Sequence, residues 1–375
     1  MRPAARARSG RVLVILDNCH EADALRLMSC LTAIRRTYRS SEITLLVNER
    51  ASAVFQRLRP FDRLITSRLY QERSSAGMRL RLKKVRELGR LVAGVGIGYD
   101  IAITLGVGST LLNVFARLAA RRTVGFANKA AWLLTSRVGR FDPYGDPVEQ
   151  HSELLAAAGV AAVEDNTTSV RAPADDDYVT ALLRQHRIDE AGVVVLHPGS
   201  DWACQQWLVD RWAELADVLA TTYGASIVFT GVAAEAEYIE NIRASMRAVS
   251  VSLAGATTLP QLEALISRAW LCVCVDSAVY DLALGTRAPV VVLAGPTDTR
   301  RGVMGRPLPL VVNRTPPGLR DDINTCKEPK DIFGGCLNYA CPMAGLRDIS
   351  VADVLETVVA HDLLKSDRRV PAVVG

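Results

Sequence analysis

The chain has 375 residues, of which 49% are hydrophobic and 23% are charged, and its formal net charge is +5. This is the composition of a soluble globular protein, and the length is sufficient for two domains with a sizeable core in each. The small net charge disfavours a protein that coats a polyanion, and no segment approaches the ~18–20 consecutive apolar residues of a membrane span. The apolar run that Asp17 ends is too short for a signal peptide. We therefore predict a cytoplasmic protein.

Short apolar runs alternate with amphipathic stretches over the first 160 residues. The runs expected to form strands are 11–16, 43–47, 63–66, 100–106 and 122–126. Helical spacing of apolar residues is present at 22–38, 50–58 and 110–120. Strands that alternate with helices predict a parallel sheet with helices on both faces.

The second half of the chain repeats this alternation. Its expected strands are 193–199, 226–231, 251–255, 271–276 and 289–295, and its expected helices are 211–223, a helix from 235, 259–269 and 279–285. A polar segment near 160–177 suits a linker. We therefore predict an α/β protein of two Rossmann-like, doubly wound domains at 1–165 and 178–350, with a C-terminal helix and tail at 351–375. Ligands of such sheets bind beyond the carboxyl ends of the strands, so we expect the domains to face each other across a cleft that holds the site.

Neither a bound cofactor nor a metal is expected. The glycine-rich stretch at 94–98 precedes an expected strand instead of following one, so it does not fit a dinucleotide-binding turn, and the chain has no P-loop motif. Cys272 and Cys274 alternate within an apolar strand, which is typical of core residues. The late cysteines match no common zinc spacing, so a structural role is expected and a metal site is the alternative. They are Cys326, Cys336 and Cys341.

Three expected strand ends in the second half carry small or polar residues of the kind that a nucleotide needs. They are His197, Pro198, Gly199 and Ser200 at the first, Thr230 and Gly231 with Glu235 at the second, and Asp276, Ser277 and Ala278 at the third. Gly199 would let the backbone approach a ligand, and Ser200 could donate a hydroxyl hydrogen bond. The third strand end opens a short helix, whose N-terminal amides carry roughly half a positive charge and favour a phosphate.

These strand ends and the motifs around them resemble a known family. The motifs HPGS…W, TG…E, LAG…TL…L, DSxxxxLA and VVLAGPT are similar, in that order, to those of the ADP-heptose transferase family of bacterial glycosyltransferases. The likeness covers nearly the whole chain, from Asp23 to the late segment 341–351, and is strongest from 193 to 297. Asp23 matches the acidic residue of the family's Gly-Asp pair, although Ala22 replaces the glycine. The family makes the lipopolysaccharide inner core and has the GT-B architecture of two Rossmann-like domains.

The resemblance implies a metal-independent, inverting transfer of a sugar, with a heptose among the candidates. The donor would be a nucleotide-diphosphate sugar, ADP-heptose-like in the first instance, and the acceptor a hydroxyl of a glycan, glycolipid or small molecule. Asp23 would be the general base that takes the proton from this hydroxyl. The diphosphate would be held by 197–200 and 277–278, and the ribose by Glu235. From the residues alone, Asp23 is also typical of a helix N-cap.

The expected donor site departs from the family at three positions. Gln205 stands where the family has a Lys, Ala278 where it has a Gly, and Asp281 where it has a His. Charge-assisted contacts to phosphate are roughly twice as strong as neutral ones, so the change at Gln205 is expected to weaken stabilisation of the leaving diphosphate. Asp281 would repel the diphosphate unless it turns outward or binds another group, and a solvated helix residue is the alternative interpretation. Cations that could replace the lysine are Arg287, Arg300 and Arg301.

Other interpretations stay open. A remodelled pocket would accept a different nucleotide sugar or acceptor, whereas a catalytically degenerate site would bind a sugar nucleotide without turnover. A nucleotide-sugar epimerase on the same fold is a further alternative. Because Asp23, the HPGS motif and Glu235 are present, we favour an active glycosyltransferase.

The segment from 63 to 90 is strongly basic. It carries nine Lys or Arg residues against Glu72 and Glu87, and its apolar residues recur at near-helical spacing. A solvated basic face is the usual meaning of such a run. The alternative is a surface that contacts an anionic glycolipid or membrane headgroups, peripheral to the inner face of the membrane. Nucleic acid is not an expected partner, because no binding motif and no interleaved aromatic set is present.

Overall fold

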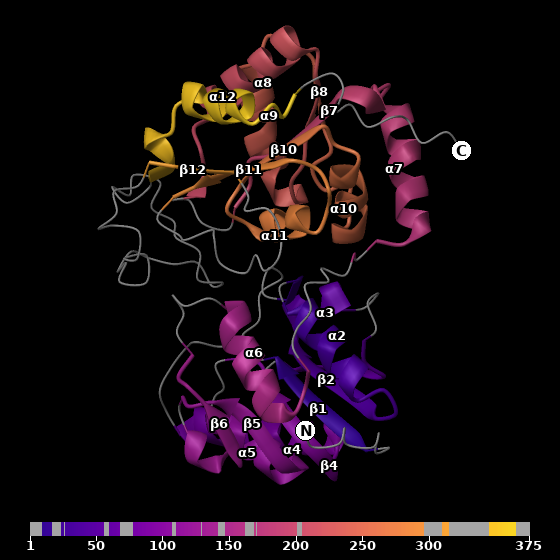
Figure 1. Ribbon diagram of the computed structural model, residues 1–375, viewed down its shortest axis with the longest axis vertical. Helices are drawn as coiled ribbons and strands as arrows, with labels where there is room; N and C mark the ends of the chain where they lie inside the picture. The colour runs from indigo at the N-terminus through magenta and orange to yellow at the C-terminus, as the bar shows by residue number, and fades with distance from the viewer. Residues whose placement is uncertain are drawn as a thin grey trace. The chain divides into compact units, whose positions relative to one another are not determined.

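The computed structural model divides the chain into two compact units, Met1–Thr168 and Ser169–Gly375 (Figure 1). The residues that the structure describes are 10–16, 24–25, 27–55, 60–67, 78–106, 110–128, 130–141, 147–161, 169, 171–200, 205–295, 310–314 and 345–364. None of the helices within these ranges is long and apolar enough to cross a membrane.

The N-terminal unit contains a six-stranded parallel sheet of order β3-β2-β1-β4-β5-β6. The strands are β1 (Arg11–Leu16), β2 (Glu42–Asn48), β3 (Arg63–Ser67), β4 (Tyr99–Thr104), β5 (Ala120–Phe126) and β6 (Ser136–Val138). The five strands expected in this half are confirmed. β6 is an addition, because three residues are too few to show a periodic pattern.

Helices connect the strands of the N-terminal unit. They are α2 (Met28–Thr37), α3 (Glu49–Phe55), α4 (Met78–Val95), α5 (Thr110–Ala119) and α6 (Pro147–Ala158). In α5 the buried residues Leu112, Phe115 and Ala119 recur every three or four positions and pack in one cluster with β1. Gly96 and Gly98, with φ angles of 87° and 89°, form the turn from α4 to β4, so the glycine-rich stretch ends a helix.

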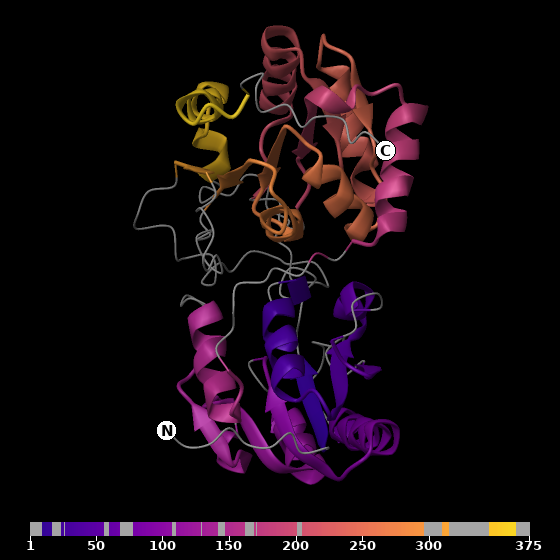
Figure 2. The same ribbon diagram turned by 45° about the vertical axis from the view of Figure 1, so that its right-hand side comes forward.

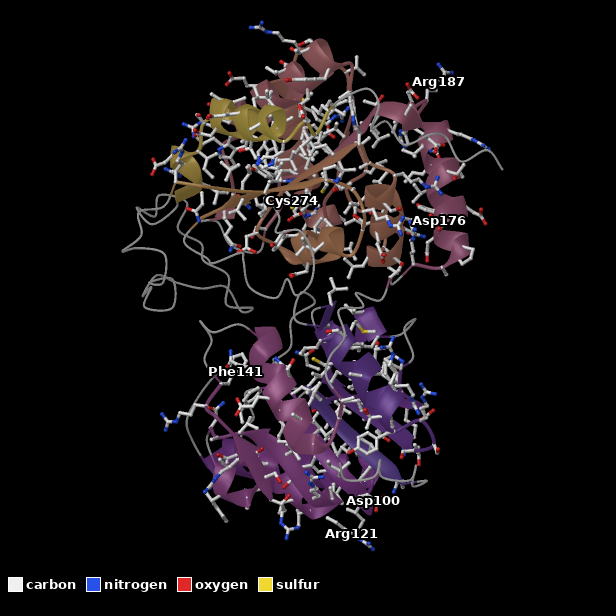
Figure 3. The ribbon with its side chains drawn as sticks, in the orientation of Figure 1. Asp100, Arg121, Phe141, Asp176, Arg187 and Cys274 are labelled. Carbon is white, nitrogen blue, oxygen red and sulfur yellow. The ribbon has the colours of Figure 1, made fainter. Side chains whose placement is uncertain are left out.

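The C-terminal unit contains a second six-stranded parallel sheet, of order β12-β11-β10-β7-β8-β9. The strands are β7 (Val193–His197), β8 (Ser226–Phe229), β9 (Ser250–Ser252), β10 (Leu271–Val275), β11 (Val290–Ala294) and β12 (Leu310–Asn313). All five strands expected in this half are confirmed, and β12 is an addition. Cys274 lies within this sheet (Figure 3).

Helices cover both faces of the C-terminal sheet. They are α7 (Pro173–Gln185), α8 (Val209–Tyr223), α9 (Ala236–Ala244), α10 (Leu259–Ser267), α11 (Ala278–Leu284) and α12 (Val351–Ala360). α8 contacts α9 and α12, whereas α10 contacts α7 and α11. Figures 1 and 2 show these two groups on opposite sides of the sheet.

The expected linker near 160–177 is shorter in the structure, because α7 begins at Pro173. Proline is favoured in the first turn of a helix, and the Asp175 carboxylate accepts a hydrogen bond from the backbone N of Ala172 at 2.9 Å. Arg268 then ties α7 to α10, since its guanidinium donates to the hydroxyl of Thr180 at 2.7 Å. The polar residues of this segment thus start a helix of the C-terminal unit.

Both sheets have the same topology. In each, the chain builds three strands outward in one direction and then returns to the other side of the first strand, so the order reverses between β1 and β4 and between β7 and β10. In doubly wound sheets a ligand crevice forms at this reversal, beyond the carboxyl ends of the two strands. The topology therefore nominates one candidate site in each unit.

Candidate functional site

The carboxyl ends of β7, β8 and β10 lie side by side. The sheet order places β7 between β10 and β8, and the register pairs His197 with Cys274 and Leu196 with Phe229. Because the three strands are parallel, the residues that follow them share one edge of the sheet. The structure thus brings together the three polar strand ends that the sequence singles out.

His197, the last residue of β7, is buried and hydrogen-bonded. Its Nδ1 lies 3.0 Å from Oγ1 of Thr230, and the backbone N of Thr230 donates to the carbonyl of Leu196 at 3.0 Å. Burial lowers the pKa of His197 to about 4, so the imidazole is neutral at neutral pH. His197 therefore joins the ends of β7 and β8 and contributes no positive charge.

The side chain of Glu235 occupies the space beside two glycines. A Cβ on Gly199 would overlap the Glu235 carboxylate, and a Cβ on Gly231 would lie 2.8 Å from its Oε2. The backbone N of Val232 donates to this Oε2 at 2.8 Å, which fixes the carboxylate in the turn after β8. Gly199 thus leaves room for the Glu235 side chain, because the direction that a Cβ would take is filled by that carboxylate.

Gln205 joins the loop after β7 to the turn after β10. Oγ of Ser200 donates to Oε1 of Gln205 at 2.7 Å, and Nε2 of Gln205 donates to Oδ2 of Asp276 at 3.4 Å. Gln205 is only 6% exposed, so solvent does not compete strongly for these bonds. A side chain without charge thus connects two of the expected site residues.

Helix α11 begins directly beyond the carboxyl end of β10. Its N-cap residue, Ser277, makes no capping hydrogen bond, and its buried hydroxyl has no hydrogen-bond partner within the described part of the chain. Oδ2 of Asp281, in the first turn, is shielded from solvent. The pKa of Cys274 is raised by its hydrogen bond with Cys272, by burial, and by neighbouring charges that include Asp281. Asp281 is therefore partly buried, with one carboxylate oxygen shielded from solvent, which differs from a fully solvated helix residue.

Other expected site residues fall elsewhere. Asp23, Arg300 and Arg301 lie outside the described residues. Arg287 precedes β11 and therefore lies toward the amino ends of the strands, at the edge opposite His197. Its expected role as a replacement cation is wrong for this reason. Pro198 and Ala278 lie at the carboxyl edge, directly after β7 and at the start of α11.

The described residues contain no group of three or more His, Cys, Asp or Glu side chains that could hold a metal ion. Cys30, Cys272 and Cys274 are buried free thiols. The two on β10 are core residues, which confirms the interpretation of their alternation. Cys326, Cys336 and Cys341 lie outside the described residues.

Gly255 supports the turn that carries Glu235, a role that its motif alone does not reveal. Its φ angle is +72°, and its backbone N donates to the carbonyl of Gly231 at 2.8 Å. A Cβ at this position would lie 3.0 Å from the Cβ of Ala233. A glycine at the end of the expected strand 251–255 was the available signal, since only glycine adopts this backbone conformation at low cost.

Comparison with known protein families and with individual proteins shows what the chain is related to. The chain matches glycosyltransferase family 9 (heptosyltransferase) over residues 88–313. It is also 30% identical over 181 residues to the lipopolysaccharide core heptosyltransferase OpsX of Haemophilus influenzae, a match that covers 46% of this chain. The chain spans about half the length of that relative, because the match covers 50% of it.

Solved structures share the fold of both units. The glycosyl transferase family 9 protein of Veillonella parvula has a TM-score of 0.73 at 19% identity, with 96% of this chain and 99% of that chain covered. The E. coli heptosyltransferase WaaC with ADP-2-deoxy-2-fluoro heptose has a TM-score of 0.63 at 18% identity, with coverages of 94% and 99%. At these identities the likeness concerns the fold, which is GT-B. Because the family match spans more than half of its residues, the chain belongs to glycosyltransferase family 9.

Proposed function

We propose that the protein is a glycosyltransferase that moves a sugar, with a heptose as the first candidate, from a nucleotide-diphosphate donor to a hydroxyl acceptor. The observation that carries this proposal is the cluster of polar strand ends at β7, β8 and β10 in a chain of family 9. The related E. coli WaaC is known with ADP and with ADP-2-deoxy-2-fluoro heptose, which favours an ADP-linked sugar.

In this proposal the carboxyl edge of the C-terminal sheet binds the donor. Residues 197–200 and 277–278 hold the diphosphate, and Glu235, fixed by the backbone N of Val232, binds the ribose. Thr230 and Gly231 shape the turn between them. The leaving diphosphate is stabilised by donors that are already in place, which lowers the barrier because no reorganisation is needed during the reaction.

Asp23 acts as the base of the proposed reaction. It follows β1 in the sequence and lies outside the residues that the structure describes. Its carboxylate takes the proton of the acceptor hydroxyl while the hydroxyl oxygen bonds to the anomeric carbon from the side opposite the diphosphate. The bond from this carbon to the diphosphate breaks, and the configuration inverts without a metal. The acceptor is a glycan, a glycolipid or a small molecule.

The test is release of nucleoside diphosphate from ADP-, GDP-, UDP- and dTDP-sugars by the wild type and by Asp23→Asn. We expect release from one donor class, and a loss of about 100-fold or more in kcat for Asp23→Asn, since a general base contributes at least this much. Donor affinity should be unchanged. The control is Asp210→Asn, an exposed carboxylate in the first turn of α8, which should retain wild-type rates.

Two results would contradict the proposal. Binding of a sugar nucleotide without release or transfer, whatever the acceptor offered, would favour the catalytically degenerate alternative. An Asp23→Asn variant with an undiminished kcat would remove Asp23 as the base while leaving the transferase assignment in place.

We propose further that the basic segment 63–90 belongs to the acceptor side. Helix α4 confirms the helical pattern within it, and Arg86 and Arg90 on this helix are exposed. An exposed basic helix face is suited to the phosphates of an anionic glycolipid or of membrane headgroups.

A further inference from the structure

We propose that Gln205 is a positioning residue of the donor site, whose amide ties Ser200 to Asp276 and thereby sets the spacing of the two connections that frame the diphosphate. The two hydrogen bonds of Gln205 follow from the interatomic distances alone. The assignment of this spacing to a diphosphate rests on the proposed function.

Gln205 lies where the strand order of the C-terminal sheet reverses. β7 leads to α8 and β10 leads to α11, and these helices belong to groups on opposite faces of the sheet (Figure 1). The two connections therefore diverge as they leave neighbouring strands, and an opening between them is where doubly wound sheets bind ligands. Gln205 belongs to the first connection, bonds to Ser200 within it, and reaches Asp276 in the second.

The orientation of the Gln205 amide follows from its partners. When the Asp276 carboxylate is ionised, its Oδ2 can accept a hydrogen bond but cannot donate one. The nitrogen of the Gln205 amide must therefore face it. The amide oxygen is then left to accept the proton of Ser200, as the 2.7 Å distance indicates. The reverse orientation would place the amide oxygen against a carboxylate oxygen and lose a bond.

The backbone that carries Gln205 is held by Trp207, two residues further along. Trp207 is 2% exposed, and its indole N–H donates to the carbonyl of Ile349 at 2.9 Å. Its own carbonyl accepts from the hydroxyl of Tyr238 at 2.7 Å, and its ring packs edge-to-face on Trp212. Because Trp207 is part of the core, the backbone at Gln205 is already fixed. Gln205 therefore loses little conformational entropy when its amide binds both partners.

The Ser200–Gln205–Asp276 bridge determines which hydrogen-bonding groups Ser200 can present to a ligand. A serine hydroxyl has one proton, and here Ser200 gives it to Gln205. Ser200 therefore does not offer this proton to a diphosphate, and the hydrogen bonds that a diphosphate accepts must come from other groups, such as backbone N–H. Gln205 acts on the donor through Ser200 and Asp276, and not by contact with the phosphates.

Glutamine is suited to this position by its two-sided amide. Lysine has no acceptor for the Ser200 hydroxyl, and a carboxylate would face the Asp276 carboxylate at hydrogen-bond distance. Methionine has a similar volume and flexibility but forms neither bond. These differences allow substitutions that remove the bridge in distinguishable ways.

The test is a double-mutant cycle on Ser200→Ala and Gln205→Met. Calorimetric titration with ADP, GDP, UDP and dTDP identifies the nucleoside diphosphate that the wild type binds, and urea unfolding is measured in parallel. We expect Gln205→Met to weaken this binding about tenfold and Ser200→Ala by about three- to tenfold. The double variant should bind no more weakly than Gln205→Met, because both changes remove the same bond. The matched control is Gln206→Met, an adjacent, partly exposed glutamine that should bind as the wild type does.

A second measurement distinguishes loss of the Ser200–Gln205–Asp276 bridge from a general loss of packing. In Gln205→Glu the introduced carboxyl faces Asp276, so the loss of affinity relative to the wild type should be largest near pH 8. It should shrink near pH 5, where the introduced carboxyl takes up a proton that it can donate to Asp276. Among the described residues, the other titratable groups at these strand ends are His197, neutral above about pH 4, the thiol of Cys274, whose pKa is raised, and the carboxylates of Glu235 and Asp281.

Three outcomes would overturn the proposal. They are unchanged binding in Gln205→Met, additive losses in the double variant, and an affinity ratio of Gln205→Glu to wild type that does not depend on pH. Failure of the proposed function looks different. In that case the wild type binds none of the four nucleoside diphosphates, while Ser200→Ala and Gln205→Met still couple in urea unfolding.

Discussion

The two sheets have the same strand order, yet the edges beyond their central strands differ in chemistry. At the end of β7, Ser200 and Gln205 form a buried polar bridge to the neighbouring turn. At the end of β4, Thr104 is buried and its hydroxyl makes no hydrogen bond within the described residues, and Leu105, which follows it, is buried as well. There Nε2 of His151 lies 2.8 Å from the carbonyl of Leu105, and the ring centroids of Phe126 and Phe141 are 5.2 Å apart. Figure 3 labels Phe141 in the N-terminal unit.

This difference indicates that topology determines where a ligand can bind, whereas the side chains at the strand ends determine which ligand binds there. In doubly wound sheets the reversal of strand order is the place where ligands bind, and both units have this reversal. The residues at the strand ends then decide what that crevice binds. In the proposed function, the polar groups at the C-terminal edge hold the donor at fixed distances, which is what stabilisation of a leaving diphosphate requires.

The largest effect on this comparison is expected from Gly199→Ala. The added Cβ overlaps the Glu235 carboxylate, so Glu235 or the loop after β7 must shift. Overpacking of this kind costs about 1–3 kcal/mol, and we expect donor affinity to fall by roughly 10–100-fold. Calorimetric titration measures the loss. The control is Gly139→Ala in the N-terminal unit, where nothing lies within 4 Å of an added Cβ, and equal affinity losses in both variants would contradict the account.

A pH dependence of stability is expected from His197. Its pKa is about 4 in the folded protein and 6.5 in an unperturbed state, so the unfolded chain takes up a proton first as the pH falls. The contribution is fully present above pH 6.5 and is lost as the pH falls toward 4. Between pH 7 and pH 5 we expect His197 to account for a loss of roughly 2 kcal/mol in the free energy of unfolding.

Urea unfolding at both pH values checks this expectation. His197→Asn should flatten the pH dependence, whereas His186→Asn, an exposed histidine at the end of α7, should leave it unchanged. The same slope in wild type and His197→Asn would show that burial at the end of β7 does not control this group.

The smallest effect is expected from the basic helix α4. Replacing Arg86 and Arg90 by Gln removes two exposed charges, and each basic residue near an anionic surface contributes about 1 kcal/mol. We therefore expect co-sedimentation with vesicles that contain anionic lipid to weaken by roughly tenfold or more, with donor affinity unchanged. Equal sedimentation of variant and wild type would contradict a lipid-binding role for α4 and would favour its interpretation as a solvated basic surface.

The strands and the three polar strand ends could be predicted from sequence because apolar runs and small polar residues are local signals. β6 and β12 are too short to give such a signal, and α7 begins within a segment whose polar composition predicts a linker. The bridge from Gln205 to Asp276 joins residues 71 positions apart. No local pattern reports such a bond, since it depends on β7 and β10 being neighbours.

Hydrogen exchange with and without the nucleoside diphosphate that binds best tests the central claim most directly. The account predicts slower exchange of backbone amides at 197–200, 230–235 and 277–281, and no change at the end of β4. Unchanged exchange at these three strand ends, in a protein saturated with nucleotide, would contradict the assignment of the donor site to the carboxyl edge of the C-terminal sheet.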